Sequence, residues 1–293
     1  MKKIAWIALV ASVMIGCSGG GAKESSYLKR VWVSGGSSLS VPESVVYDQA
    51  HNRLYVSNVN SGASGNPWQD NKGFISSLDS SGEVQVLHWV DGLKAPKGLA
   101  LDGKMLYVAD LNEVVKIDTE NAKIIRRYRA PQGVERLNDI VYDANRSRLY
   151  VSDSKTKVIY ALDEKNGKFT ELYPKEQDPK AEQNGLCLNQ DQLIMQGSVG
   201  YLKSLGLKDH HIRNLSSTLE VPIDGVTTYH DRGYLVSSWV GEIYHVSKNG
   251  TVLSLLKSKP SRSADIFYAP MLDLLLVPDF DAHIIAYKVK NIK

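Results

Sequence analysis

Six polar residues recur along this chain, each at the start of a short apolar segment. They are Glu43, Lys97, Asn138, Asn184, Asp224 and Asp265. Glu43 and Asp224 carry carboxylates, and two carboxylates neutralise one divalent ion. Asn138 and Asn184 add amide oxygens, and this oxygen-rich set suits Ca²⁺ or, less stringently, Mg²⁺ or Mn²⁺. If the fold brings these four side chains together, we expect a divalent-metal site with room for waters and a substrate oxygen.

At any single position a structural role competes with this interpretation. Asn and Asp before a strand often cap turns, and polar side chains commonly solvate a water-filled centre of a fold. Such roles explain one position more easily than four. Lys97 has no counterpart in a metal site, and its positive charge could offset that of Asp265.

The segments that carry these residues are copies of one unit. The clearest copy spans residues 136–153, where an apolar strand opens on a polar pair and a turn leads to a second apolar strand. Residues 42–58 and 97–110 are close copies, and weaker copies begin at the last three of the six polar positions. The chain is therefore built from six repeats.

The spacing of the repeats predicts the fold. The steps between the six polar residues are 54, 41, 46, 40 and 41 residues, and no convincing helical periodicity appears after residue 26. A period near 40 residues with four short strands is typical of a β-propeller blade. In the third unit we expect strands at 137–142, 149–152, 158–162 and 169–172. We predict an all-β, six-bladed β-propeller over residues 27–293, with residues 27–34 closing the last blade.

Propeller geometry brings the six polar residues to one place. The first strand of each blade lines the central channel, so the opening residues gather around the channel mouth on one face. The long first step reflects a polar insertion, residues 58–72, between the second and third strands of blade one. This connection returns to the same face, and we expect Trp68 to overhang the mouth.

The first residues predict export and lipid attachment. Lys2 and Lys3 precede a short apolar run that ends at Cys17, and the four residues 14–17 resemble the lipobox of bacterial lipoproteins. On this resemblance residues 1–16 are a signal peptide and Cys17 is lipidated. Ser18 then favours the outer membrane, facing the periplasm. An ordinary secretory signal with a coincidental cysteine is the alternative, and residues 17–26 form a flexible tether.

Charge and cysteine content limit the binding partners and disulfide bonds that we expect. The formal net charge is +3, and it falls to +1 without Lys2 and Lys3, so a nucleic-acid partner is not expected. Cys187 is the only cysteine left after Cys17, so we do not expect an intrachain disulfide in the mature domain. We expect a monomer.

Four short motifs resemble a known family. Pro42-Glu43, the Arg136-x-Asn138-Asp139 segment, Asn184-Gly185 and Asp224-Gly225 are similar to motifs of the SMP-30/gluconolactonase (regucalcin) family, across about residues 40–290. Members are six-bladed propellers with a central divalent metal, and related diisopropylfluorophosphatase-like and paraoxonase-like propellers share the order Glu, Asn, Asn, Asp. This chain departs from the family where Ser44-Val45 and Ile140 replace Gly-Pro and Gly.

The resemblance implies a role for each residue. Glu43, Asn184 and Asp224 would hold the metal. Asn138 would be a ligand or a substrate contact. Arg136 would contact substrate oxygens, and Asp224 or the water that it shares with the metal would act as the base.

We therefore expect a metal-dependent hydrolase of a lactone or ester in the cell envelope. The metal would be Ca²⁺ first, with Mg²⁺, Mn²⁺ or Zn²⁺ as alternatives. Arg136, Asn138, Trp68, Lys97 and Asp265 would contact the small-molecule substrate. The alternative is an envelope-tethered propeller that binds a sugar or protein without chemistry, with any metal structural, because a fold does not fix a function.

Overall fold

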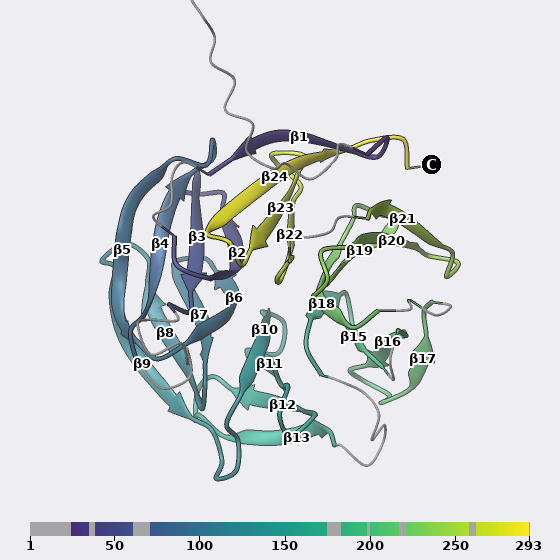
Figure 1. Ribbon diagram of the computed structural model, residues 1–293. Helices are drawn as coiled ribbons and strands as arrows, with labels where there is room; N and C mark the ends of the chain where they lie inside the picture. Colours follow the sequence, from purple (N-terminus) through teal and green to yellow (C-terminus); the bar gives the residue numbers. More distant parts are fainter. Residues whose placement is uncertain are drawn as a thin grey trace, which may run out of the picture.

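The chain forms a six-bladed β-propeller, as the repeats predicted. The computed structural model describes residues 25–34, 39–60, 71–174, 183–197, 200–216, 219, 221–257 and 262–292. This part contains 24 strands and no α-helix. The strands form six four-stranded antiparallel sheets around a central axis (Figure 1). Across the same residues, no helix has the length and apolar character needed to cross a membrane.

Each of the first five blades uses four strands that are consecutive in the chain. Blade one is β2 (Pro42–Asp48), β3 (Arg53–Asn58), β4 (Gly73–Asp79) and β5 (Val84–Leu93). Blade two is β6 (Pro96–Asp102), β7 (Met105–Asp110), β8 (Glu113–Asp118) and β9 (Lys123–Arg129). Blade three is β10 (Leu137–Asp143), β11 (Arg148–Asp153), β12 (Val158–Asp163) and β13 (Phe169–Tyr173). Blade four is β14 (Leu186–Asn189), β15 (Gln192–Gln196), β16 (Leu202–Gly206) and β17 (Ile212–Asn214), and blade five is β18 (Ile223–Thr228), β19 (Gly233–Ser238), β20 (Ile243–Ser247) and β21 (Val252–Leu256).

The sixth blade joins the two ends of the chain. It combines β22 (Phe267–Ala269), β23 (Leu274–Asp279) and β24 (His283–Val289) with β1 (Leu28–Val33) as its outermost strand. β1 pairs antiparallel with β24, with Leu28 opposite Val289 and Val33 opposite Ile285. The predicted closure is confirmed, and it removes an unpaired sheet edge.

The core lies between the blades. The described buried apolar residues form six clusters, and each cluster joins two neighbouring blades. Tyr55, Tyr107 and Tyr150 occupy the same place in their second strands, and all three are buried in these clusters. Burying a large apolar side chain stabilises a fold by about 1.5–3 kcal/mol. The recurring tyrosines therefore stabilise the packing between neighbouring blades.

The axis of the ring encloses a cavity of about 340 Å³. Residues of all six first strands line it, and Asp139 and Asp265 stand at the end nearest the strand starts. The insertion of blade one lies between β3 and β4 in the chain, as expected. Its residues 61–70, including Trp68, lie outside the described residues, as do Cys17 and the whole predicted signal peptide.

Candidate functional site

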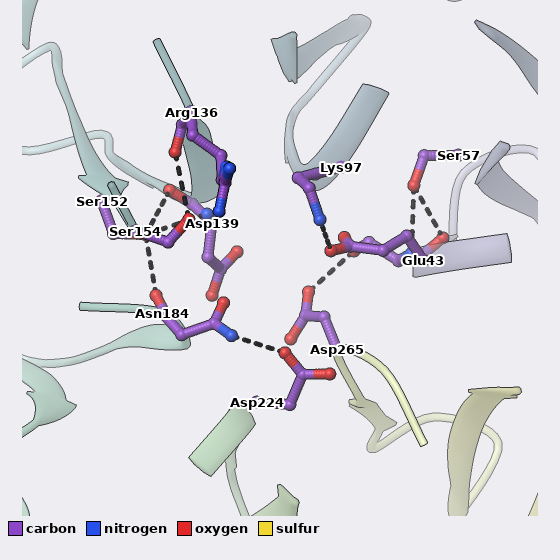
Figure 2. A network of polar contacts seen from close by, with 11 residues as sticks. Glu43, Ser57, Lys97, Arg136, Asp139, Ser152, Ser154, Asn184, Asp224 and Asp265 are labelled. Carbon is purple, nitrogen blue, oxygen red and sulfur yellow. Dashed lines mark hydrogen bonds and ion pairs between the residues drawn. The ribbon is translucent and has the colours of Figure 1, made fainter. Parts of the chain in front are cut away.

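The polar residues that open the first strands meet at one mouth of the central channel. Figure 2 shows Glu43, Lys97, Asn184, Asp224 and Asp265 converging from five different blades. Blade three contributes Asp139 to the same cluster (Figure 2). Five of the six predicted positions therefore gather at the mouth, and blade three adds Asp139, the neighbour of Asn138.

β-Bulges release most of these side chains from the sheet. The register between first and second strands shifts between Pro42 and Ser44, between Pro96 and Leu99, between Leu137 and Ile140, and between Ile223 and Val226. A bulge leaves residues unpaired and redirects their side chains, and such bulges are common beside active sites. Asn184 and Asp265 need no bulge, because they precede β14 and β22.

A serine in the second strand holds each of three bulges. The backbone N–H groups of Ser44, Asp139 and Gly225 donate to the side-chain oxygens of Ser57, Ser152 and Ser237 at 3.0, 2.9 and 2.9 Å, respectively. The Ser152 hydroxyl also donates to the Asn184 carbonyl at 2.8 Å, and the Ser237 hydroxyl donates to the Ala264 carbonyl at 2.8 Å. All three serines therefore fix a bulge, and Ser152 and Ser237 also fix the start of the next blade.

Glycines after the polar residues allow neighbouring blades to approach. A Cβ on Gly98 would lie 2.6 Å from the Cα of Asp139. A Cβ on Gly185 would lie 2.6 Å from the Asp224 carbonyl oxygen, and one on Gly225 would lie 2.5 Å from the backbone nitrogen of Ile266. The pairs Lys-Gly, Asn-Gly and Asp-Gly thus have a shared physical reason: the next blade's first strand occupies the space of a side chain.

Lys97 forms a buried ion pair with Glu43. Its ammonium nitrogen donates to Glu43 Oε1, and the two side chains are only 9% and 2% exposed. The other oxygen, Glu43 Oε2, is buried and accepts no hydrogen bond from the residues that the structure describes. Lys97 was predicted to contact substrate, and the structure shows it beside a predicted metal ligand.

Asp224 faces the same mouth from blade five. The Asn184 amide nitrogen donates to Asp224 Oδ1 at 2.6 Å, whereas Asp224 Oδ2 is buried without a hydrogen-bond partner. Burial and, next, repulsion from Glu43 together raise the pKa of Asp224 to about 7, although Lys97 and the hydrogen bond from Asn184 oppose the shift. This carboxyl group can therefore exchange a proton near neutral pH.

Asp139 is the member of the cluster that sequence reasoning missed. Its carboxylate accepts hydrogen bonds from the backbone N–H of Ile140 at 2.6 Å and of Leu186 at 2.5 Å, which ties blade three to blade four. Burial is the main cause that raises the pKa of Asp139, and the net pKa is about 8 even though the two N–H donors act to lower it. Its only sequence signal was its place in the polar pair with Asn138.

Asp265 completes the cluster beside Glu43. Asp265 Oδ2 accepts a hydrogen bond from the Ser44 hydroxyl at 2.8 Å, and its backbone N–H donates to the Glu43 carbonyl at 3.0 Å. Burial raises the pKa of Asp265 well above the ordinary value, and the Asp139 carboxylate adds to the shift. Blade six therefore closes the polar ring against blade one.

Asn138 and Arg136 occupy different surroundings. Asn138 is buried in the bulge of β10, and no hydrogen bond of the described residues joins its side chain to Glu43, Asn184 or Asp224. Arg136 is exposed on the blade-three side of the cluster (Figure 2). It also lines a surface pocket of about 430 Å³ that includes Lys94. Their proposed substrate contacts remain predictions.

The donor chemistry of the mouth fits a divalent cation. Glu43 Oε2 and Asp224 Oδ2 are buried acceptors without partners, a costly arrangement that a cation would relieve. The described residues contain no group of three or more His, Cys, Asp or Glu side chains placed to hold a metal. A bound ion would therefore take two carboxylates and complete its shell with an amide oxygen, which half a turn of the Asn184 side chain would supply, and with water.

Comparisons with known proteins extend to the fold only. The sequence matches no protein-family model and no curated protein. The structure is similar to a gluconolactonase from Xanthomonas campestris, with a TM-score of 0.69 and 13% identity over 92% of this chain and 98% of that chain. It is also similar to a catalytically inactive virginiamycin B lyase from Staphylococcus aureus with quinupristin, with a TM-score of 0.63 and 14% identity over 90% of this chain and 99% of that chain.

A chain of a nidogen–laminin complex is similar as well. Its TM-score is 0.63 and its identity 16%, over 77% of this chain and 84% of that chain. These proteins differ in their named chemistry, and all are below a quarter identical to this chain. The likenesses therefore support the six-bladed architecture and leave the activity to be inferred from the channel mouth.

Proposed function

We propose that the channel mouth is the active site of a hydrolase that acts on a lactone or ester with a divalent cation. The observation that carries this proposal is the pair of buried carboxylate oxygens without partners, Glu43 Oε2 and Asp224 Oδ2, at one mouth. The order of the Glu, Asn, Asn and Asp motifs and the shared fold with a gluconolactonase support it.

Glu43, Asp224 and Asn184 would hold the cation, with Asn138 as a further ligand or substrate contact. Ca²⁺ suits these oxygen donors best, and Mg²⁺, Mn²⁺ and Zn²⁺ are alternatives. When bound, such an ion polarises a carbonyl group and lowers the pKa of a bound water.

Each residue at the mouth then has its own proposed role in the reaction. Asp224 would also be the general base, because its carboxylate has two oxygens at the mouth, one for the cation and one to accept a proton. Arg136 offers a planar fork of donors to substrate oxygens. We propose Lys97, Asp265 and Trp68 as further substrate contacts.

A second proposal concerns location. We infer that the mature chain is lipid-anchored through Cys17 at the outer membrane, faces the periplasm and acts as a monomer on a small molecule. Metabolic labelling with a fatty acid tests the anchor, because wild-type protein should carry the label and Cys17→Ala should not. Label on the variant, or none on the wild type, would contradict it.

A binding module is the competing function. The ammonium of Lys97 already supplies one positive charge to Glu43, so the mouth could hold a polar ligand without a metal. Under this alternative the cluster would bind a sugar or a protein and perform no chemistry.

Chelation separates the two functions. The protein without its first 17 residues is stripped with chelator and assayed for hydrolysis of aldonolactones and aryl esters, with and without each of the four divalent ions. The hydrolase proposal predicts turnover that chelation abolishes and one of the ions restores. Ligand binding without metal-dependent turnover in any condition would support the binding module.

A further inference from the structure

An exposed aromatic residue stands at the rim of the channel mouth. Trp239 follows β19, and 56% of its surface is exposed, while its neighbour Val240 is 41% exposed. Large apolar side chains are usually withdrawn from water, so an exposed Trp at a polar mouth indicates an apolar ligand surface.

A tight turn fixes the position of this indole ring. The Ser238 N–H donates to the Glu242 carbonyl at 2.9 Å, and the Gly241 N–H donates to the Ser238 carbonyl at 2.9 Å. Gly241 has a φ of 88°, which favours glycine. Trp239 therefore projects from a closed, hydrogen-bonded turn.

Two neighbouring side chains orient the ring. Phe280 packs edge-to-face against Trp239, with ring centroids 6.4 Å apart and an interplanar angle of 88°. The guanidinium carbon of Arg262 lies 5.7 Å from the Trp239 ring centroid. Aromatic and cation–π contacts of this kind are favourable and directional, and they leave more than half of Trp239 exposed.

The strand register places the Trp239 turn on the same face of the propeller as the candidate catalytic residues. Ser238, directly before Trp239, pairs with Ile223, directly before Asp224. Asp279, directly before Phe280, forms a bridge with Ser263, two residues before Asp265. The Ser263 hydroxyl also donates to the Ser238 carbonyl at 2.8 Å, which locks the two turns together.

We propose that Trp239, supported by Phe280 and Arg262, is a stacking platform for the ring of a substrate whose ester or lactone group lies at the mouth. This inference rests on the proposed function for its substrate class. It assigns specificity for esters that carry an aromatic ring, because an indole gains most from a flat apolar partner.

The test compares matched ligands and variants. Phenyl acetate and ethyl acetate are the substrates, and phenylacetamide and acetamide are non-ester probes for direct binding by titration. The platform predicts that Trp239→Ala raises KM for phenyl acetate and Kd for phenylacetamide about tenfold, a loss typical of one stacked ring. Values for ethyl acetate and acetamide should stay unchanged, kcat should change less than twofold, and Trp239→Phe should restore most of the binding.

Ile125→Ala is the control variant, because Ile125 is a 49% exposed apolar residue on the outer strand β9. It should leave every value unchanged. Equal binding of phenylacetamide and acetamide by the wild type, or unchanged phenylacetamide binding in Trp239→Ala, would overturn the platform. Absence of ester turnover with the binding difference intact would instead count against the hydrolase and leave the platform standing.

Discussion

Lys97→Met isolates the contribution of the buried ammonium at the mouth. Methionine keeps a similar length and apolar stem, and it removes the charge that pairs with Glu43. Breaking one partner of a buried ion pair typically costs about 3–5 kcal/mol, because the remaining charge stays buried and uncompensated. At about 2–4 °C per kcal/mol, the melting temperature of the metal-free variant should fall by at least about 6 °C.

A divalent cation should reverse this loss. Two unit charges roughly 5 Å apart interact by about 3 kcal/mol at an effective dielectric constant of about 20. Removing the Lys97 ammonium therefore removes repulsion of the ion and frees both oxygens of Glu43 as ligands. We predict that Lys97→Met binds Ca²⁺ at least about tenfold more tightly than the wild type, equivalent to about 1.4 kcal/mol.

Thermal unfolding in chelator and in a Ca²⁺ series measures both effects, and calorimetric titration gives the affinities. Wild-type protein with the ion at about one hundred times its Kd should gain roughly 2.7 kcal/mol. Lys104→Met is a matched control, because Lys104 pairs with Glu120 on the surface, where such a pair contributes about 0–1 kcal/mol.

The double variant Lys97→Met/Glu43→Gln separates charge from packing. It removes both charges, so in chelator it should be more stable than Lys97→Met alone, and it should lose the Ca²⁺ response. Two results would refute the reasoning: Lys97→Met as stable as wild type in chelator, or a Ca²⁺ affinity equal to or below that of the wild type.

Two further predictions concern packing and pH. Gly98→Ala should destabilise the fold by about 1–3 kcal/mol in denaturant unfolding, because its Cβ would lie 2.6 Å from the Asp139 Cα. Gly197→Ala should cost less, since its Cβ meets only the flexible side chain of Lys203; equal losses would contradict this account of the glycines. Burial raises the pKa of Asp224 to about 7 and of Asp139 to about 8, so the folded chain keeps protons that the unfolded chain releases above about 3.9. In chelator the free energy of unfolding should therefore fall as the pH rises from about 4 to 8, and a flat or rising profile would refute the assigned shifts.

Much of the fold followed from local patterns. The repeat spacing predicted six blades because each blade restarts with the same strand–turn–strand phrase. The strands expected at 137–142 and 158–162 correspond to β10 and β12 within one residue. The pairing of β1 with β24 was also predictable, since the last repeat lacked its fourth strand.

The arrangement within the site was less predictable. Asn138 and Asp139 are adjacent and both polar, and both lie in the bulge of β10. Their sequence does not show that Asp139 is the one whose carboxylate binds the start of blade four. A serine recurs in the second strands, and in blades three and five it binds the bulge and the next blade. An apolar pattern of period two does not reveal where one residue leaves the ladder.

No pattern in the sequence indicates which charged residues from different blades pair with one another. Lys97 reaches Glu43, in the first strand of the preceding blade, and only the closed ring shows that they pair. The aromatic contact between Trp239 and Phe280 likewise depends on two turns that meet across blades five and six. Trp68 and Cys17 lie outside the described residues, and their roles stay predictions.

The most direct test of the central claim is the rate of hydrolysis of an aldonolactone and of an aryl ester by wild type and Asp224→Asn, measured side by side with saturating metal. Asn keeps the size of Asp224 and removes the group that accepts the proton, a contribution of about 10²–10⁴-fold. We predict that metal-loaded wild type turns over and that Asp224→Asn is at least about a hundredfold slower. Equal rates, or no turnover by metal-loaded wild type, would contradict the account of the mouth as a hydrolase site.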